Sequence, residues 1–135
     1  MDKTPIIIIV LIVLAGVIFW AFQSGIFTGP IKPTQLPAGP VLFFGEDCPH
    51  CKIVEAYITD NGIDQKVKYT KMEIPFNGKT SPELKANAEL LVQLAQTCEL
   101  DMTNGVSIPF LYDGSKCLVG QDDVINFFKN AAGTQ

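Results

Sequence analysis

VLFFGEDCPHC, at residues 41–51, is the stretch of sequence that decides the fold. Its first four residues form a short apolar run bounded by a proline and a glycine, which is typical of a strand buried on both faces. Pro49 suits the first position of a helix, so Cys48 would cap that helix, and Asn61-Gly62 is a suitable terminator. The stretch therefore predicts a buried strand that leads directly into a helix with a cysteine at its start.

The sequence after this helix predicts a second strand at Lys66–Ile74. Val67 and Tyr69 would share one face of that strand, but the apolar positions then shift to Met72 and Ile74. A bulge in the strand would explain this change of parity.

Two strands and two helices are expected further along the chain. Ser81-Pro82 opens a helix whose apolar stripe extends to Cys98. Val106–Tyr112 and Cys117–Gly120 indicate two strands joined by a tight turn. A last helix is predicted from about Asp122, and its buried residues would be Val124, Phe127, Phe128 and Ala131. The order β-α-β-α-β-β-α predicts an α/β domain.

Cys48 and Cys51 lie one helical turn apart, so their sulfur atoms can approach to bonding distance. Unpaired backbone N–H groups and the positive end of the helix dipole would stabilise the Cys48 thiolate. Cys48 is therefore predicted to be the attacking sulfur. Cys51 lies further into the helix and would resolve the mixed disulfide that Cys48 forms with a substrate. This pattern predicts thiol–disulfide exchange.

His50 is the only histidine in the chain and lies between the two cysteines. Its imidazole can stabilise the Cys48 thiolate by charge or by hydrogen bonding, and Pro49 completes the Cys-Pro-His-Cys motif. Stabilising the reduced form makes the disulfide a stronger oxidant, and about 30 mV corresponds to about 1.4 kcal/mol. His50 is thus a candidate for deciding the direction of exchange.

The Cys-x-x-Cys spacing also forms half of many tetrahedral zinc sites. A second half would need another Cys-x-x-Cys or a His-x-x-x-His, and neither occurs. Cys98 and Cys117 would have to converge on a helix start that is already committed to a strand–helix turn. We therefore predict no metal and no cofactor. An inert structural disulfide between Cys48 and Cys51 is a further alternative.

Cys98 falls on the apolar stripe of its helix, where a free cysteine behaves as a small hydrophobic residue. Cys117, at the start of a strand, is a candidate disulfide partner for it in an oxidising compartment. Sequence does not show whether their Cα atoms come within reach, so both alternatives stay open.

Three features occur together: Cys-Pro-His-Cys after a buried strand, Ile108-Pro109 at the start of a strand, and Gly120-Gln121-Asp122 between a strand and a helix. Over roughly residues 40–132, this combination resembles the thioredoxin and glutaredoxin superfamily. The resemblance implies a thioredoxin fold with a mixed four-stranded sheet. It also implies that Pro109 is cis and faces the cysteine pair, and that Pro109 and the Ile108 backbone position the substrate peptide.

The Pro-His dipeptide is similar to that of periplasmic disulfide-forming oxidases, whereas the size of the domain is closer to a glutaredoxin. Those oxidases carry a large helical insertion, and here one helix at about 82–98 takes its place, so the similarity concerns the motif and not the whole architecture. Glu46 and Asp47 place negative charge beside Cys48, and the double glycine usual before the last helix is missing. Both departures put the use of glutathione in doubt.

Residues 5–27 are predicted to be a membrane anchor, because they carry no charge and about 20 apolar residues span a bilayer. A cleaved secretory signal and a buried core helix are the competing interpretations. Residues 28–40 contain four prolines and predict a semi-rigid linker. The predicted organisation is an anchor at 1–27, this linker, and a thioredoxin-fold domain at 41–135. The few flanking lysines favour an extracytoplasmic domain.

The net charge is −4, and the ten basic residues are all lysine with no dense block, so no nucleic-acid partner is predicted. We expect a membrane-tethered oxidoreductase that exchanges disulfides with protein thiols and disulfides, and an unidentified partner that recycles its cysteine pair. The alternatives are a cytosol-facing glutaredoxin-like reductase and a non-catalytic thioredoxin-fold module that senses redox state or binds a partner.

Overall fold

The computed structural model describes three stretches of the chain: residues 12–17, 19–20 and 36–133. The chain divides into two units, residues 1–34 and 35–135, and the described residues of the first unit are helical. Most of the predicted anchor at 5–27 and of the linker at 28–40 lies outside the described residues. Within the described stretches, no helix has both the length and the apolar character that crossing a membrane requires.

The second unit contains a four-stranded mixed sheet in the order β2-β1-β3-β4. Its strands are β1 (Val41–Phe44), β2 (Thr70–Glu73), β3 (Phe110–Tyr112) and β4 (Cys117–Val119). β1 is parallel to β2 and antiparallel to β3, and β3 is antiparallel to β4. This α/β architecture is consistent with the thioredoxin fold that the sequence predicts.

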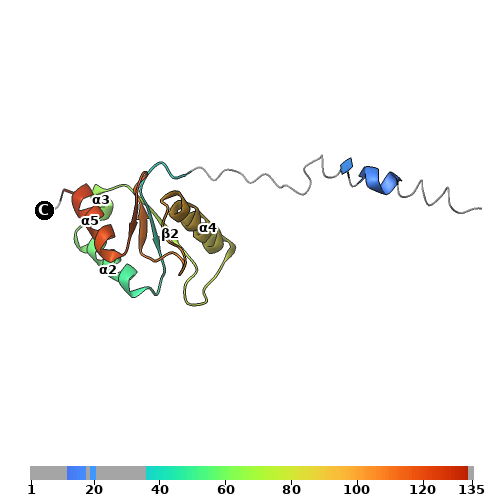
Figure 1. Ribbon diagram of the computed structural model, residues 1–135. Helices are drawn as coiled ribbons and strands as arrows, with labels where there is room; N and C mark the ends of the chain where they lie inside the picture. The colour runs from blue at the N-terminus through green and yellow to red at the C-terminus, as the bar shows by residue number, and fades with distance from the viewer. Residues whose placement is uncertain (1–11, 18, 21–35, 134–135) are drawn as a thin grey trace, which may run out of the picture. The chain divides into compact units, whose positions relative to one another are not determined.

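Helices cover both faces of the sheet (Figure 1). They are α2 (Pro49–Asp60), α3 (Ile63–Lys66), α4 (Pro82–Thr97) and α5 (Gln121–Ala131). α2, α3 and α5 lie on one face, and α4 lies on the other. Val41 and Phe43 of β1 pack into the core on the α4 side, and Leu42 packs into the core on the α2 side. The prediction of a strand buried on both faces is confirmed for β1.

The predicted strand at Lys66–Ile74 is wrong in its first part. Ile63–Lys66 forms the short helix α3, and β2 begins only at Thr70. From there β2 pairs with β1 residue by residue to Glu73, so the expected bulge does not occur in this ladder.

The change of apolar parity in this segment has a different cause. Val67 and Tyr69 pack into the core on the α2 side, whereas Met72 and Ile74 pack into the core on the α4 side. Successive residues of an extended chain point to opposite faces. Because helices cover both faces of this sheet, apolar side chains at odd-numbered and at even-numbered positions can both be buried.

The predicted strand at Val106–Tyr112 is also shorter, since β3 begins at Phe110. Pro109 has no N–H group to donate to a neighbouring strand, although its carbonyl oxygen accepts a hydrogen bond from Gly120 N at 2.8 Å. Residues 106–108 therefore belong to the loop before the strand.

The last helix, α5, begins within a residue of the predicted start and buries Val124 and Phe128. Phe127 is half-buried, and Ala131 is exposed, which contradicts the prediction that Ala131 is buried. Ala132, just after the helix ends, packs against the core in its place.

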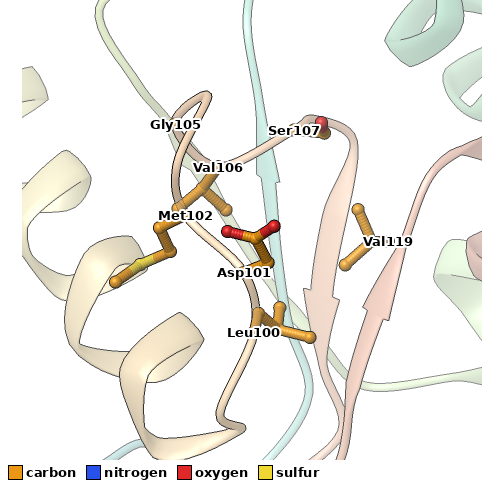
Figure 2. Close-up of a pocket in the computed structure, with 7 residues that line it drawn as sticks. All are labelled: Leu100, Asp101, Met102, Gly105, Val106, Ser107 and Val119. Carbon is orange, nitrogen blue, oxygen red and sulfur yellow. The ribbon is translucent and has the colours of Figure 1, made fainter.

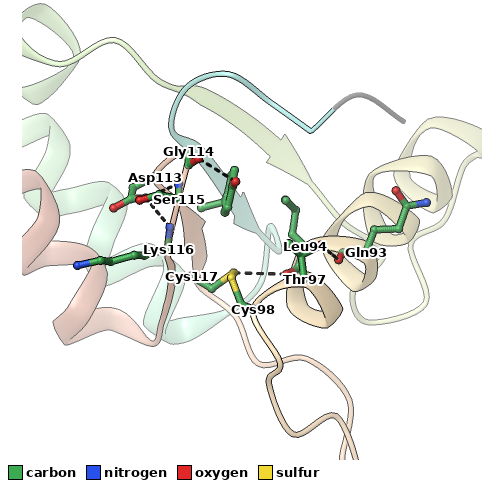
Figure 3. Close-up of a disulfide and its surroundings, with 10 residues drawn as sticks. Gln93, Leu94, Thr97, Cys98, Asp113, Gly114, Ser115, Lys116 and Cys117 are labelled. Atoms are coloured by element: carbon green, nitrogen blue, oxygen red, sulfur yellow. Dashed lines mark hydrogen bonds between the residues drawn. A yellow bond between two sulfur atoms is a disulfide. The ribbon is translucent and has the colours of Figure 1, made fainter. Parts of the chain in front are cut away.

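A disulfide joins Cys98, the C-cap of α4, to Cys117, the first residue of β4 (Figure 3). The two Cα atoms are 6.1 Å apart, and the sequence separation is 19 residues. The chain between them consists of a loop at residues 99–109, β3 and the β3–β4 turn. The bond therefore fixes both ends of the segment that carries Ile108 and Pro109.

Candidate functional site

Cys48 occupies the N-cap position of α2, where the chain leaves β1. Its backbone N–H donates to Gly45 O at 3.1 Å, and its sulfur accepts a hydrogen bond from Cys51 N at 3.3 Å. Pro49 follows at the first helical position, where its missing N–H costs the helix nothing. The Cys48 sulfur thus lies at the point toward which the N–H groups of the first helical turn are directed. These N–H groups can stabilise a negative charge there.

Ile108 and Pro109 lie beside this sulfur. Cys48 Sγ is 3.9 Å from Ile108 O, although 60 residues separate the two in sequence. The Ile108–Pro109 peptide bond is cis, as the resemblance implies, and Pro109 is buried. β1 and β3 are antiparallel neighbours, so the end of β1 meets the start of β3 and brings these residues together.

Cys51 lies one turn into α2, is only 1% exposed, and has a free thiol. Burial raises the pKa of this thiol to about 12, and a hydrogen bond with the Cys48 side chain acts in the same direction. A backbone hydrogen bond at Gly45 partly opposes both effects. Near neutral pH, Cys51 is therefore a protonated thiol. Cys48 is also buried, but slightly less so, with 4% of its surface exposed against 1% for Cys51.

This raised pKa predicts that the reduced protein loses stability in alkali. Above the ordinary thiol pKa of 9.0 the unfolded chain releases the Cys51 proton, while the folded chain retains it up to about pH 12. Ionisation then favours the unfolded state, so the free energy of unfolding should fall across that range. Urea unfolding should show that, between pH 8 and pH 11, the free energy of unfolding falls more steeply for the reduced full chain than for the Cys51→Ala variant. Parallel curves for the two proteins would contradict the assigned burial effect.

Gly45, the residue directly after β1, is closely covered by two apolar side chains. A Cβ atom at this position would lie 2.8 Å from Phe76 Cγ and 3.0 Å from Ile108 Cδ1. The absence of a side chain at Gly45 therefore allows Phe76 and Ile108 to pack over the backbone that leads to Cys48. Phe76 belongs to a turn at residues 76–79, closed by a bridge between Phe76 and Lys79.

Replacing Gly45 with alanine is expected to destabilise the protein by about 1–3 kcal/mol, the usual cost of overpacking. The added methyl group must displace Phe76 or Ile108, which also shifts the backbone beside Cys48. Gly39→Ala is a matched control, because nothing lies within 4 Å of its added Cβ. Urea unfolding of the two variants provides the comparison, and equal midpoints would contradict the close approach at Gly45.

The two acidic residues that precede Cys48, Glu46 and Asp47, each form an ion pair with a lysine. Lys79 forms an ion pair with Glu46 and another, at 2.9 Å, with Glu73. The hydrogen bond and charge of Lys79 lower the pKa of Glu46. Asp47 lies 3.8 Å from Lys52, and both are exposed. Lys79 thereby ties the 76–79 turn to the loop that precedes Cys48.

His50 is exposed in the first turn of α2, and its Nδ1 lies 2.8 Å from Gln121 Oε1. Because the amide oxygen can only accept, Nδ1 is the nitrogen that carries the proton in this arrangement. Gln121 Nε2 in turn donates to Asp122 Oδ1 at 3.3 Å. The start of α5 therefore orients the imidazole that lies between the two cysteines.

The structure brings together Cys48, Cys51, Ile108 and Pro109, and holds His50 against α5. It places Cys98 and Cys117 elsewhere, in their own disulfide. In the part of the chain that is described, no group of three or more His, Cys, Asp and Glu side chains is arranged to hold a metal ion.

Two parts of the site were not predicted. The first is the contact of Gln121 with His50. Gln121 belongs to the Gly-Gln-Asp motif, but nothing in that motif indicates a partner 71 residues away. The second is the turn at residues 76–79. Its Asn77-Gly78 dipeptide is a turn signal, yet a local signal cannot show that the turn packs against Gly45.

No protein-family model matches the chain, and no curated protein matches it. Solved structures that are similar to it include two glutaredoxins, each at 20% sequence identity. Oxidized glutaredoxin 2 from Chlamydomonas reinhardtii matches with a TM-score of 0.42, over 72% of this chain and 84% of that one. The buckwheat glutaredoxin–glutathione complex matches with a TM-score of 0.42, over 70% of each chain.

Proposed function

We propose that this protein is a membrane-tethered thiol–disulfide oxidoreductase that exchanges disulfides with protein substrates through Cys48 and Cys51. One observation carries the proposal: the Cys48 sulfur caps α2 beside Ile108 O, and the Cys51 thiol lies buried one turn behind it. An attacking sulfur at a helix start and a shielded resolving sulfur are what exchange through a mixed disulfide requires.

In the reducing direction, the Cys48 thiolate attacks one sulfur of a substrate disulfide. A bond forms between Cys48 and that sulfur, and the other substrate sulfur leaves as a thiolate, which takes up a proton. Cys51 then loses its proton to solvent and attacks Cys48 Sγ, which closes the Cys48–Cys51 disulfide and releases the second substrate thiolate. The substrate gains two electrons and the protein loses two, and the reverse sequence inserts a disulfide.

The raised pKa of Cys51 suits this order of steps. While Cys48 is a thiolate, its charge is one of the causes that keep the Cys51 proton bound. Once Cys48 is part of a mixed disulfide, that charge is gone, so Cys51 ionises more readily than before. Burial, the largest cause of the raised pKa of Cys51, is still present in the mixed disulfide, and the loss of the Cys48 charge removes one of the smaller causes.

Each turnover leaves the cysteine pair in the opposite redox state, so a second thiol or disulfide partner must recycle it. Proteins are the proposed substrates, with Ile108 and Pro109 positioning the segment that carries the reacting cysteine. The test is turnover of insulin disulfides by the full chain with dithiothreitol as reductant. Catalysed reduction is expected, and a rate equal to dithiothreitol alone would overturn the enzymatic proposal in favour of a non-catalytic module.

The direction of exchange is read from the reduction potential, measured by equilibration with glutathione redox buffers. A value near about −120 mV indicates an oxidase, and one near about −270 mV indicates a reductase. His50→Ala should make the potential more negative by on the order of 30 mV, because an imidazole in the first turn favours the reduced, thiolate form. Asp60→Ala, at the far end of α2, is the control. An equal potential for wild type and His50→Ala would remove His50 from the mechanism.

The proposed membrane anchor is residues 5–27. Its described residues, 12–17 and 19–20, are helical and carry no charge, and their large apolar side chains are 52–69% exposed. Such side chains are stable in contact with lipid. We place the domain on the extracytoplasmic side, and protease treatment of intact cells tests this placement. Cleavage of the domain is expected, while protection until the cells are lysed would favour a cytosol-facing reductase.

A further inference from the structure

A pocket of about 240 Å³ opens between the loop that follows α4 and strand β4 (Figure 2). Leu100, Met102, Val106 and Val119 form its apolar wall, and Asp101 and Ser107 are its side chains with polar ends. These apolar residues also pack against the core on the α4 side, so the core holds the wall of the pocket in position.

Asp101 is the only charged residue that lines this pocket. Its Oδ1 accepts hydrogen bonds from Thr103 N at 2.9 Å and Thr103 Oγ1 at 2.5 Å. These bonds lower the pKa of Asp101, so the carboxyl group is ionised. Figure 2 shows the carboxylate directed toward the space that the apolar side chains enclose.

The Asp101 carboxylate has no cationic partner within the described residues. The sequence between Lys85 and Lys116 contains no lysine or arginine at all. Only Oδ1 is engaged by Thr103, so Oδ2 is available to accept from a ligand. The pocket therefore combines apolar walls with one oriented, unpaired negative charge.

Two neighbouring residues, Ser107 and Ile108, connect the pocket with the reacting sulfur along the chain. Ser107 lines the pocket, and the carbonyl oxygen of the next residue lies 3.9 Å from Cys48 Sγ. A polypeptide joined to Cys48 by a mixed disulfide must pass Ile108. Because an extended chain advances about 3.3–3.6 Å per residue, a side chain one to three residues from the substrate cysteine can reach the pocket.

We propose that this pocket binds a lysine or arginine side chain of the protein substrate, one to three residues from its reacting cysteine. The inference rests on the proposed exchange function and names its substrate class. The aliphatic part of such a side chain covers the apolar wall, and the cationic end pairs with Asp101. A purely apolar side chain would instead desolvate the carboxylate without giving it a partner. The net charge of −4 also favours the binding of basic substrate segments, because a negatively charged protein attracts them.

The test uses disulfide-containing peptides that are identical except for one residue, which is either lysine or its uncharged analogue norleucine. This residue is placed in turn at each of three positions on either side of the reacting cysteine. At one position or more, the wild-type full chain should turn over the lysine peptide with kcat/KM about fivefold or more above that of the norleucine peptide, mainly through KM. Asp101→Asn keeps an oxygen that accepts from Thr103 but removes the charge, so the ratio should fall to about one.

Glu89→Gln is the matched control, because Glu89 is an exposed acid on α4 outside this pocket and its replacement should leave the lysine preference as in wild type. Equal kcat/KM values for lysine and norleucine peptides at every position would overturn the inference, as would an unchanged preference in Asp101→Asn. In both cases turnover of the peptides would still support the exchange function. No turnover of any peptide, nor of hydroxyethyl disulfide, would overturn that function and this inference together.

Discussion

Replacing Cys48 with serine is expected to reduce the rate of insulin disulfide reduction by at least about 10³-fold, the scale on which removal of a covalent nucleophile acts. The serine hydroxyl fits the N-cap position and can accept the same hydrogen bond from Cys51 N, so the fold should be retained. It cannot form a disulfide. The loss should therefore concern kcat, with an unchanged urea unfolding midpoint for the reduced protein.

The Cys51→Ser variant separates the roles of the two sulfurs. It retains the attacking sulfur at position 48 but lacks the resolving one, so it should accumulate a mixed disulfide with the substrate that survives denaturing, non-reducing electrophoresis. Cys48→Ser should not accumulate this species. If Cys48→Ser reduced insulin as fast as the wild-type chain, or if only Cys51 formed the mixed disulfide, the assigned roles would be wrong.

Removing the Cys98–Cys117 disulfide is expected to cost about 3 kcal/mol of unfolding free energy. The bond closes a loop with a sequence separation of 19 residues, and the chain-entropy estimate for a loop of that size is about 3 kcal/mol. The double variant Cys98→Ser/Cys117→Ser, unfolded in urea without reductant, provides the measurement. Because the disulfide bounds the loop at residues 99–109, its removal should also raise KM for peptide substrates.

Serine at these two positions adds hydroxyl groups to a partly buried site, so a Cys98→Ala/Cys117→Val variant serves as the control for polarity. Both double variants should lose a similar amount of stability if the cross-link is responsible. A loss confined to the serine variant would show instead that buried hydroxyl groups, and not the missing bond, account for the effect.

The first strand and the helix after it were predictable because each depends on neighbouring residues. A four-residue apolar run, Pro49 at the first helical position and Asn61-Gly62 at its end are all local signals. The predicted start of β2 was wrong because the sequence at Ile63–Lys66 carries no strong signal for a single turn of helix. Tertiary packing decides such short elements, since Ile63 is fully buried against the core.

By itself the sequence determined where the cysteine pair lies, because a buried apolar run and Pro49 are local signals that place Cys48 and Cys51 at the start of a helix. Tertiary structure alone decided what surrounds them: Ile108 beside Cys48, Gln121 on His50, and Phe76 over Gly45. The physical reason is the range of the forces involved. Helix caps and the apolar pattern of a strand depend on residues a few positions apart, whereas these contacts join segments 31 or more residues apart and exist only once both faces of the sheet are packed.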